Sequence, residues 1–275
     1  MDRASFANLR VLVVGDAAVG KTALVENIGT GGGASRGPES HDVGMKSEWT
    51  CGCALSVVRE VVEVEMRPME VEVELWEVGG TQTYATARPV FYDGFDAVVL
   101  VYDVSNMKSY HNLVVWLFEL CTSACLPSLR YWDSGGGSGG VPEADLEDGD
   151  GAVAQGHAMQ RALLGGLCPV LFVAHKCDLR PQQAVTQRAV GSPLLRPQPP
   201  ERLNLLDRFL GGGDTNPSAH RSLSLAEERL LDQLCDFVQR GRHTEATSKE
   251  DAQSFDFVLW RDFIRRAVEA RRNST

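Results

Sequence analysis

The stretch GDAAVGKT, residues 15–22, constrains the fold more than any other feature, because it fits the phosphate-binding pattern G-x-x-x-x-G-K-[ST]. An apolar run that predicts a strand over 9–14 precedes it, and a helical pattern over 21–28 follows it. In this context, loop N–H groups and the helix N-terminus face phosphate oxygens. The residues expected to bind phosphate are Gly15, Asp16, Ala17, Ala18, Val19, Gly20, Lys21, Thr22 and Ala23.

Strand and helix patterns alternate along the rest of the chain. Residues 54–68 and 69–78 alternate apolar with charged side chains and are broken at Arg67-Pro68, which predicts an antiparallel hairpin at a sheet edge. The segments 95–104 and 168–178 are almost continuously apolar and predict buried central strands. Helices are expected over 108–120, 224–241 and 252–272, with a short strand at 242–246. This order predicts an α/β fold with a doubly wound, mostly parallel sheet, which binds ligands at the carboxyl ends of its strands.

Two irregular stretches interrupt this order. Residues 133–156 are rich in glycine and acid, and residues 180–223 are rich in proline and glycine, with a short helix expected near 203–210. We therefore expect surface insertions at about 123–166 and 180–223. The remainder is the size of one compact domain, so the interpretation is a single domain over 1–275.

Composition limits the partners and the compartment. A net charge of −10 argues against general nucleic-acid binding, and the arginines at 261, 265, 266, 271 and 272 are expected to form a solvated helix face. The seven cysteines are scattered, and no secretory signal precedes them, which favours a reducing, cytoplasmic setting. No apolar run approaches the roughly 20 residues that span a bilayer. Neither Met1-Asp2 nor Asn273-Ser274-Thr275 matches a lipidation motif, so no direct lipid anchor is expected.

A phosphate loop fits kinases, ATPases and GTPases equally, so the base specificity must be inferred from other segments. HKCD (175–178) resembles the [NT]-K-x-D guanine signature, with His175 in place of Asn or Thr. LWEVGG (75–80) lies where small GTPases carry W-D-x-[AG]-G, SEWTCGC (47–53) precedes the second strand, and EATSK (245–249) looks like E-T-S-A-K. These segments, in this order, resemble the Ras-superfamily small GTPases outside the two insertions. WTCGC, WEVGG and residues 87–116 favour a Rab-like branch.

The resemblance implies a P-loop G domain that binds GTP or GDP with Mg²⁺. Its sheet would have six strands, mostly parallel with one antiparallel edge strand, and helices on both faces. The implied guanine contacts are His175, Lys176, Asp178, Ala246, Thr247 and Ser248. The implied metal ligands are Thr22, Thr50 and Glu77, and the implied catalytic positions are Lys21, Thr50, Gly80 and Thr81. Implied partners are effector, exchange or activating proteins, with membranes reached through them; a homodimer is also compatible.

Three functions remain open from the sequence. The first is a GTP-hydrolysing switch in intracellular transport or signalling, with slow turnover because Thr81 replaces the Gln that aligns water in Ras-like proteins. Gln82 lies one residue later and would point differently. The second is a binding module that the nucleotide stabilises without hydrolysis. The third is an adenine-specific kinase or ATPase, against which Asp178 argues.

Overall fold

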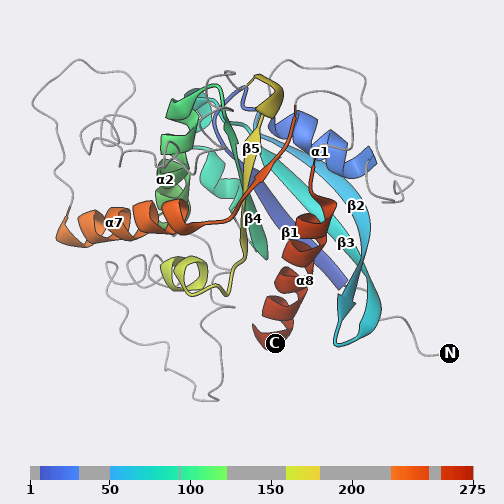
Figure 1. The fold of residues 1–275 in the computed structure, drawn as a ribbon. Helices are drawn as coiled ribbons and strands as arrows, with labels where there is room; N and C mark the ends of the chain where they lie inside the picture. Colours follow the sequence, from blue (N-terminus) through green and yellow to red (C-terminus); the bar gives the residue numbers. More distant parts are fainter. Residues whose placement is uncertain are drawn as a thin grey trace, which may run out of the picture.

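The computed structural model describes residues 7–30, 50–92, 94–122, 159–179, 224–247 and 255–274 (Figure 1). Within these ranges a six-stranded sheet is flanked by helices. The strands are β1 (Ala7–Val14), β2 (Cys53–Val64), β3 (Arg67–Val78), β4 (Ala97–Asp103), β5 (Val170–His175) and β6 (His243–Glu245). The helices are α1 (Lys21–Thr30), α2 (Met107–Thr122), α7 (Leu225–Arg240) and α8 (Phe257–Ser274).

The strand order is β2-β3-β1-β4-β5-β6. Every neighbouring pair is parallel except β2 with β3, so the sheet has one antiparallel edge strand. Each residue of β4 is buried, as its continuous apolar sequence predicts. The prediction of a mostly parallel six-stranded α/β sheet is therefore confirmed.

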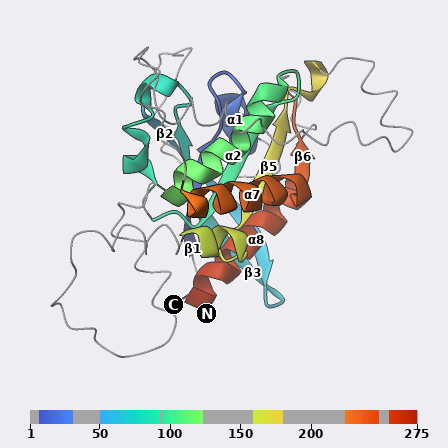
Figure 2. The same cartoon turned by 90° about the vertical axis from the view of Figure 1, so that its left-hand side faces the viewer.

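Helices cover both faces of the sheet, and each face has its own apolar core. α2 and α7 lie on one face (Figure 2) and pack with side chains such as Leu12, Leu100 and Phe172. α1 and α8 lie on the other face, where Trp260, Phe263 and Ile264 of α8 meet the sheet. The apolar stripe of α8 is thus core, as its helical spacing predicts.

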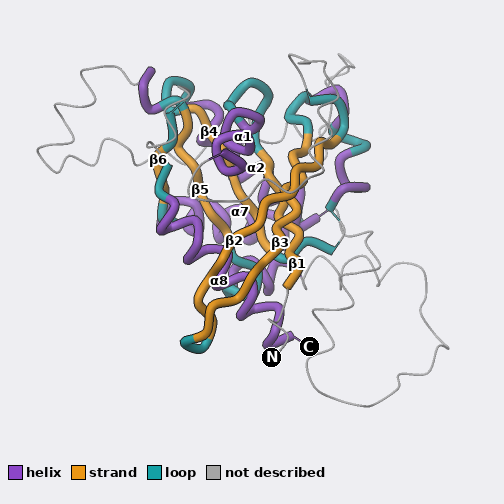
Figure 3. The backbone as a smooth tube through the Cα atoms, turned by 90° about the vertical axis from the view of Figure 1, so that its right-hand side faces the viewer, coloured by secondary structure: helices purple, strands orange, loops and turns teal. Residues whose placement is uncertain are grey.

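The β2–β3 hairpin extends past the other strands at one end of the sheet (Figure 3). Its turn lies at Glu65-Met66, where both residues have positive φ, and not at Arg67-Pro68 as the sequence suggested. Arg67 and Pro68 are instead the first residues of β3. The proline is tolerated because the pairing of β3 with β1 begins only at Val71.

The first insertion is shorter than the range 123–166 expected from the sequence. Residues 159–164 form a helical segment, and Met159, Ala162 and Leu163 are buried in the core beside α2. The glycine-rich part of that range, the range 180–223 and the helix expected near 203–210 lie outside the described residues.

The arginines of α8 are largely paired with acids. Arg265 and Arg266 bridge to Asp262 within the helix, and Arg271 reaches Asp96. The pairs within α8 are largely exposed, and exposed ion pairs contribute little stability. In the part of the chain that the structure describes, no helix is long and apolar enough to cross a membrane.

Candidate nucleotide-binding site

The predicted site segments gather at the carboxyl edge of the parallel strands. The loop 15–20 follows β1, Gly79 and Gly80 follow β3, and the segment 176–179 follows β5. Residues 246–247 follow β6 and contact the same region, because the N–H of Cys177 donates to the carbonyl of Ala246 at 3.1 Å. The sheet topology therefore brings together segments that are far apart in the sequence.

The loop between β1 and α1 has the backbone shape of a phosphate cradle. Gly15, Ala18 and Gly20 have positive φ, a backbone conformation found in loops that bind anions through their N–H groups. Lys21 is buried, and its Nζ donates to the carbonyl oxygens of Gly15 at 3.0 Å and Asp16 at 2.8 Å. Burial lowers the pKa of Lys21 to about 8, and a bound phosphate would favour the charged form.

The cradle is packed against its neighbours too closely for side chains at three glycines. A Cβ on Gly15 would lie 2.2 Å from the carbonyl oxygen of Val101, and one on Gly20 would lie 2.2 Å from Nδ1 of His175. A Cβ on Gly80 would lie 2.4 Å from the backbone nitrogen of Ala17. The loop after β3 therefore lies directly against the phosphate loop.

Two of the three predicted metal ligands donate hydrogen bonds to one oxygen atom of the third. The hydroxyls of Thr22 and Thr50 donate to Oε1 of Glu77 at 2.7 Å and 2.8 Å. Glu77 is buried at the end of β3, and its extra methylene relative to Asp is accommodated there. A carboxylate with two hydroxyls is a hard oxygen donor set, and Mg²⁺ in phosphate sites uses one or two carboxylates of this kind. The residues present fit that ion.

The predicted base contacts include Lys176, which lies beside Ala18 of the phosphate loop. Nζ of Lys176 donates to the carbonyl of Ala18 at 2.6 Å and to Oδ2 of Asp103 at 2.8 Å, so its stem lies against the phosphate loop. Lys176 and Ala18 both have positive φ, a strain that concentrates at functional sites. Asp178 follows in the short helix Cys177–Leu179 and is partly exposed. Ala246 is buried and Thr247 partly exposed, while Ser248 lies outside the described residues.

His175 is fully buried against the phosphate loop. Its ring occupies the space that a side chain on Gly20 would need. Among the described residues, neither ring nitrogen has a hydrogen-bond partner. Burial is the main reason why its pKa falls to about 4, with the charge of Lys176 adding to it. The imidazole therefore supports the loop in its neutral form, and a hydrogen bond from it to the base stays a prediction.

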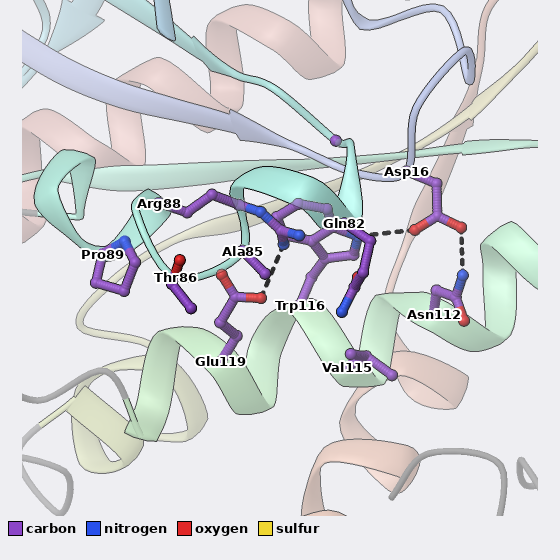
Figure 4. A pocket seen from close by; sticks show the side chains of 11 residues that line it. Asp16, Gln82, Ala85, Thr86, Arg88, Pro89, Asn112, Val115, Trp116 and Glu119 are labelled. Atoms are coloured by element: carbon purple, nitrogen blue, oxygen red, sulfur yellow. Dashed lines mark hydrogen bonds and ion pairs between the residues drawn. The ribbon is translucent and has the colours of Figure 1, made fainter. Parts of the chain in front are cut away.

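α2 supplies contacts to the phosphate loop that the sequence did not indicate. Asp16 turns away from the cradle and accepts hydrogen bonds from Asn112 and from Nε1 of Trp116, the latter at 3.1 Å (Figure 4). Beside them is a pocket of about 220 Å³. Arg88, whose guanidinium lies 4.4 Å above the Trp116 ring, and Gln82 also line it. In the sequence, only the position of Asp16 inside the phosphate loop could have indicated these contacts with α2.

Comparison with known proteins finds relatives for part of the chain. The family described as Ras of Complex, Roc, domain of DAPkinase matches residues 10–125. Rab-like protein 3 of Bos taurus is 33% identical over 130 residues, which cover 46% of this chain and 51% of the relative. Small GTPase LIP1 of Arabidopsis thaliana is 36% identical over 140 residues, which cover 49% of this chain and 38% of the relative. Residues 10–125 are therefore similar to a Ras-like GTPase domain, and about half of the chain resembles Rab-like and plant small GTPases.

The chain spans about half the length of the Rab-like relatives that it matches. The Roc match includes the phosphate loop, Glu77, Gly80 and α2, and it ends at residue 125. The segments around Lys176 and Ala246 come after it. Their place in the site rests on the sheet, which brings the ends of β5 and β6 beside the phosphate loop.

The burial of His175 predicts that the stability of the protein depends on pH. The unfolded imidazole titrates near pH 6.5 and the folded one near 4, so between these values the unfolded state binds more protons. Stability is then lost as the pH falls, by about 2 kcal/mol between pH 7 and pH 5. Urea unfolding of wild type and His175→Asn at both pH values measures this. The variant should lose less stability by about that amount, and equal losses in both proteins would contradict the assignment.

Proposed function

We propose that the protein is a Rab-like GTPase that binds GTP and GDP with Mg²⁺ and hydrolyses GTP slowly. The observation that carries the proposal is the convergence of Thr22 and Thr50 on Glu77 beside the phosphate loop. Those residues come from α1, the segment before β2 and the end of β3. Three separate elements that present oxygen ligands beside one phosphate cradle support a site for a metal-bound nucleoside phosphate.

The chain's own groups divide the work of binding. Backbone N–H groups of residues 15–22 and the N-terminus of α1 bind the phosphate oxygens, and Lys21 leaves its carbonyl partners to contact the β- and γ-phosphates. Thr22, Thr50 and Glu77 hold Mg²⁺, which neutralises the phosphate charge when bound. Gly80, against Ala17, presents its N–H to the γ-phosphate.

Guanine specificity is assigned to the ends of β5 and β6. Asp178 accepts from N1–H and the exocyclic amine of guanine, two donors that adenine lacks in this arrangement. The stem of Lys176 covers the base, because its Nζ is held by Ala18 and Asp103. The backbone of Ala246 and Thr247 covers the opposite edge, beside Cys177.

Slow hydrolysis follows from the side chains after Gly80. Thr81 has one short hydroxyl where a Gln would supply both a donor and an acceptor to the attacking water. Gln82 is no replacement, because its side chain lines the pocket and extends toward Val115 of α2 (Figure 4). The remaining parts, Lys21, Thr50 and Gly80, position and stabilise the γ-phosphate. The chain would act as a switch whose nucleotide state is sensed by effectors and altered by exchange and activating proteins.

The metal-side assignment predicts that Thr22→Asn removes nucleotide binding. With Mg²⁺ and GDP at about a hundred times the dissociation constant, binding adds about 2.7 kcal/mol to wild-type stability. Thermal unfolding with and without the ligand should show this gain in wild type and little of it in Thr22→Asn or Lys21→Ala. Thr30→Asn is the matched control, because it makes the same change at the other end of α1, where the hydroxyl caps the helix's own carbonyls. Equal ligand-induced gains in all four proteins would refute the site.

The missing water-aligning side chain predicts a low intrinsic rate that one substitution raises. Single-turnover hydrolysis of preloaded GTP should proceed on the order of 10⁻⁴ s⁻¹ or below in wild type. Thr81→Gln should accelerate it by about tenfold or more, because it restores a positioned group in the transition state. Gln82→Ala should leave the rate unchanged. A wild-type rate near 1 s⁻¹ would contradict the account, and complete absence of turnover in every variant would favour a nucleotide-stabilised binding module.

A further inference from the structure

The loop that follows Gly80 is fastened to α2 through buried charges. Arg88, in the short helix Arg88–Phe91, is 3% exposed, and its Nη1 donates to Oε2 of Glu119 at 2.8 Å. Its guanidinium also lies 4.4 Å above the ring of Trp116. A planar cation that is paired, stacked and buried is held in one orientation.

Glu119 holds the same loop at a second point. Its Oε1 accepts from the hydroxyl of Tyr92 at 2.6 Å, while Oε2 accepts from Arg88. Burial raises the pKa of Tyr92, so its hydroxyl stays protonated and donates. One carboxylate on α2 therefore fixes both ends of the segment 88–92.

From this anchor the guanidinium reaches back to the phosphate-contacting turn. Nη2 of Arg88 makes a long contact of 3.4 Å with the carbonyl oxygen of Thr81, the residue directly after Gly80. Trp116, on which Arg88 stacks, donates to Asp16 of the phosphate loop. α2 thus contacts both loops that would enclose a γ-phosphate, the phosphate loop through Asp16 and the loop after Gly80 through Arg88 (Figure 4).

This arrangement bears on the cost of binding a third phosphate. Ordering a loop costs conformational entropy, so a loop that becomes ordered only on binding lowers the affinity for the ligand that orders it. Gly80 lies directly against Ala17 in the structure. A held loop lowers that cost for GTP, whereas GDP has no γ-phosphate for Gly80 to contact.

We propose that Arg88 is a positioning residue which, anchored by Glu119, holds Gly80 and Thr81 against the phosphate loop and so favours GTP over GDP. The proposal rests on the proposed function, because it assumes that Gly80 contacts a γ-phosphate. Arg88 does not touch the nucleotide; it acts through the backbone of the loop. Its signature is a changed preference between two nucleotides, which a general loss of stability does not produce.

The test compares dissociation constants for Mg·GDP and for Mg²⁺ with a non-hydrolysable GTP analogue in full-length protein. Arg88→Ala should weaken the analogue by about tenfold and GDP by less than about twofold. Glu119→Gln retains the shape of the side chain and removes its charge, so it should shift the preference in the same direction. It also carries the test if Arg88→Ala does not fold.

A matched control lies on the opposite face of the sheet. Glu60 is a buried carboxylate that accepts from Nε1 of Trp260 at 2.9 Å and pairs with Arg261 at 3.4 Å. Glu60→Gln should lower the midpoint of thermal unfolding without changing the ratio of the two constants. An unchanged ratio in the Arg88 and Glu119 variants, or equal weakening of both nucleotides, would overturn the proposal. Wild type that binds neither nucleotide would instead overturn the proposed function.

Discussion

Close packing around the phosphate loop is the constraint on which the rest of the site depends. Gly15 lies against the backbone of β4, Gly20 against His175 at the end of β5, and Gly80 against Ala17. A side chain at any of these positions would separate the loop from an element that carries site residues. The loop is also held by directed contacts: Lys176 donates to the carbonyl of Ala18, and Trp116 donates to Asp16. The cradle is therefore a shared surface of β4, β5, α2 and the loop after β3, and contacts with these elements fix its shape.

This shared surface links specificity with chemistry. Lys176 contacts both Ala18 of the phosphate loop and Asp103. These contacts fix the position of the segment that would cover the base relative to the loop that would hold the phosphates. On the other side, Glu77 accepts hydrogen bonds from Thr22 and Thr50. These bonds hold the segment before β2 close to the N-terminus of α1. α2 adds the third connection through Arg88 and Glu119. Each connection is a charge-assisted hydrogen bond in a partly or fully buried setting, where such bonds are strong and where loss of one partner is costly.

The sequence predicts those parts of the structure that have a local motif or a local hydrophobic periodicity. The phosphate loop, the alternating strands 53–64 and 67–78, and the continuously apolar β4 each carry their own periodicity, and the ends of parallel strands then place Glu77, Gly80 and Lys176 at one edge. The hairpin turn was misplaced because Pro68 is a stronger local breaker than Glu65-Met66, yet it is tolerated before the pairing with β1 begins. The helix at 159–164 was missed because glycine-rich neighbours dominated its composition. The contacts of Asp16 with Trp116 and of Arg88 with Glu119 join residues 100 and 31 positions apart, and no periodicity encodes such pairs.

The proposed guanine-nucleotide site consists of the phosphate loop and the ends of β5 and β6. Its most direct test is a calorimetric titration of the nucleotide-free chain with GDP and with ADP, each with Mg²⁺, in wild type and in Asp178→Asn. In wild type, GDP should bind at least about a hundredfold tighter than ADP, because adenine lacks the pair of donors that guanine presents to the carboxylate of Asp178. In Asp178→Asn, GDP should weaken and xanthosine diphosphate should strengthen. Equal affinity of wild type for GDP and ADP would contradict the claim.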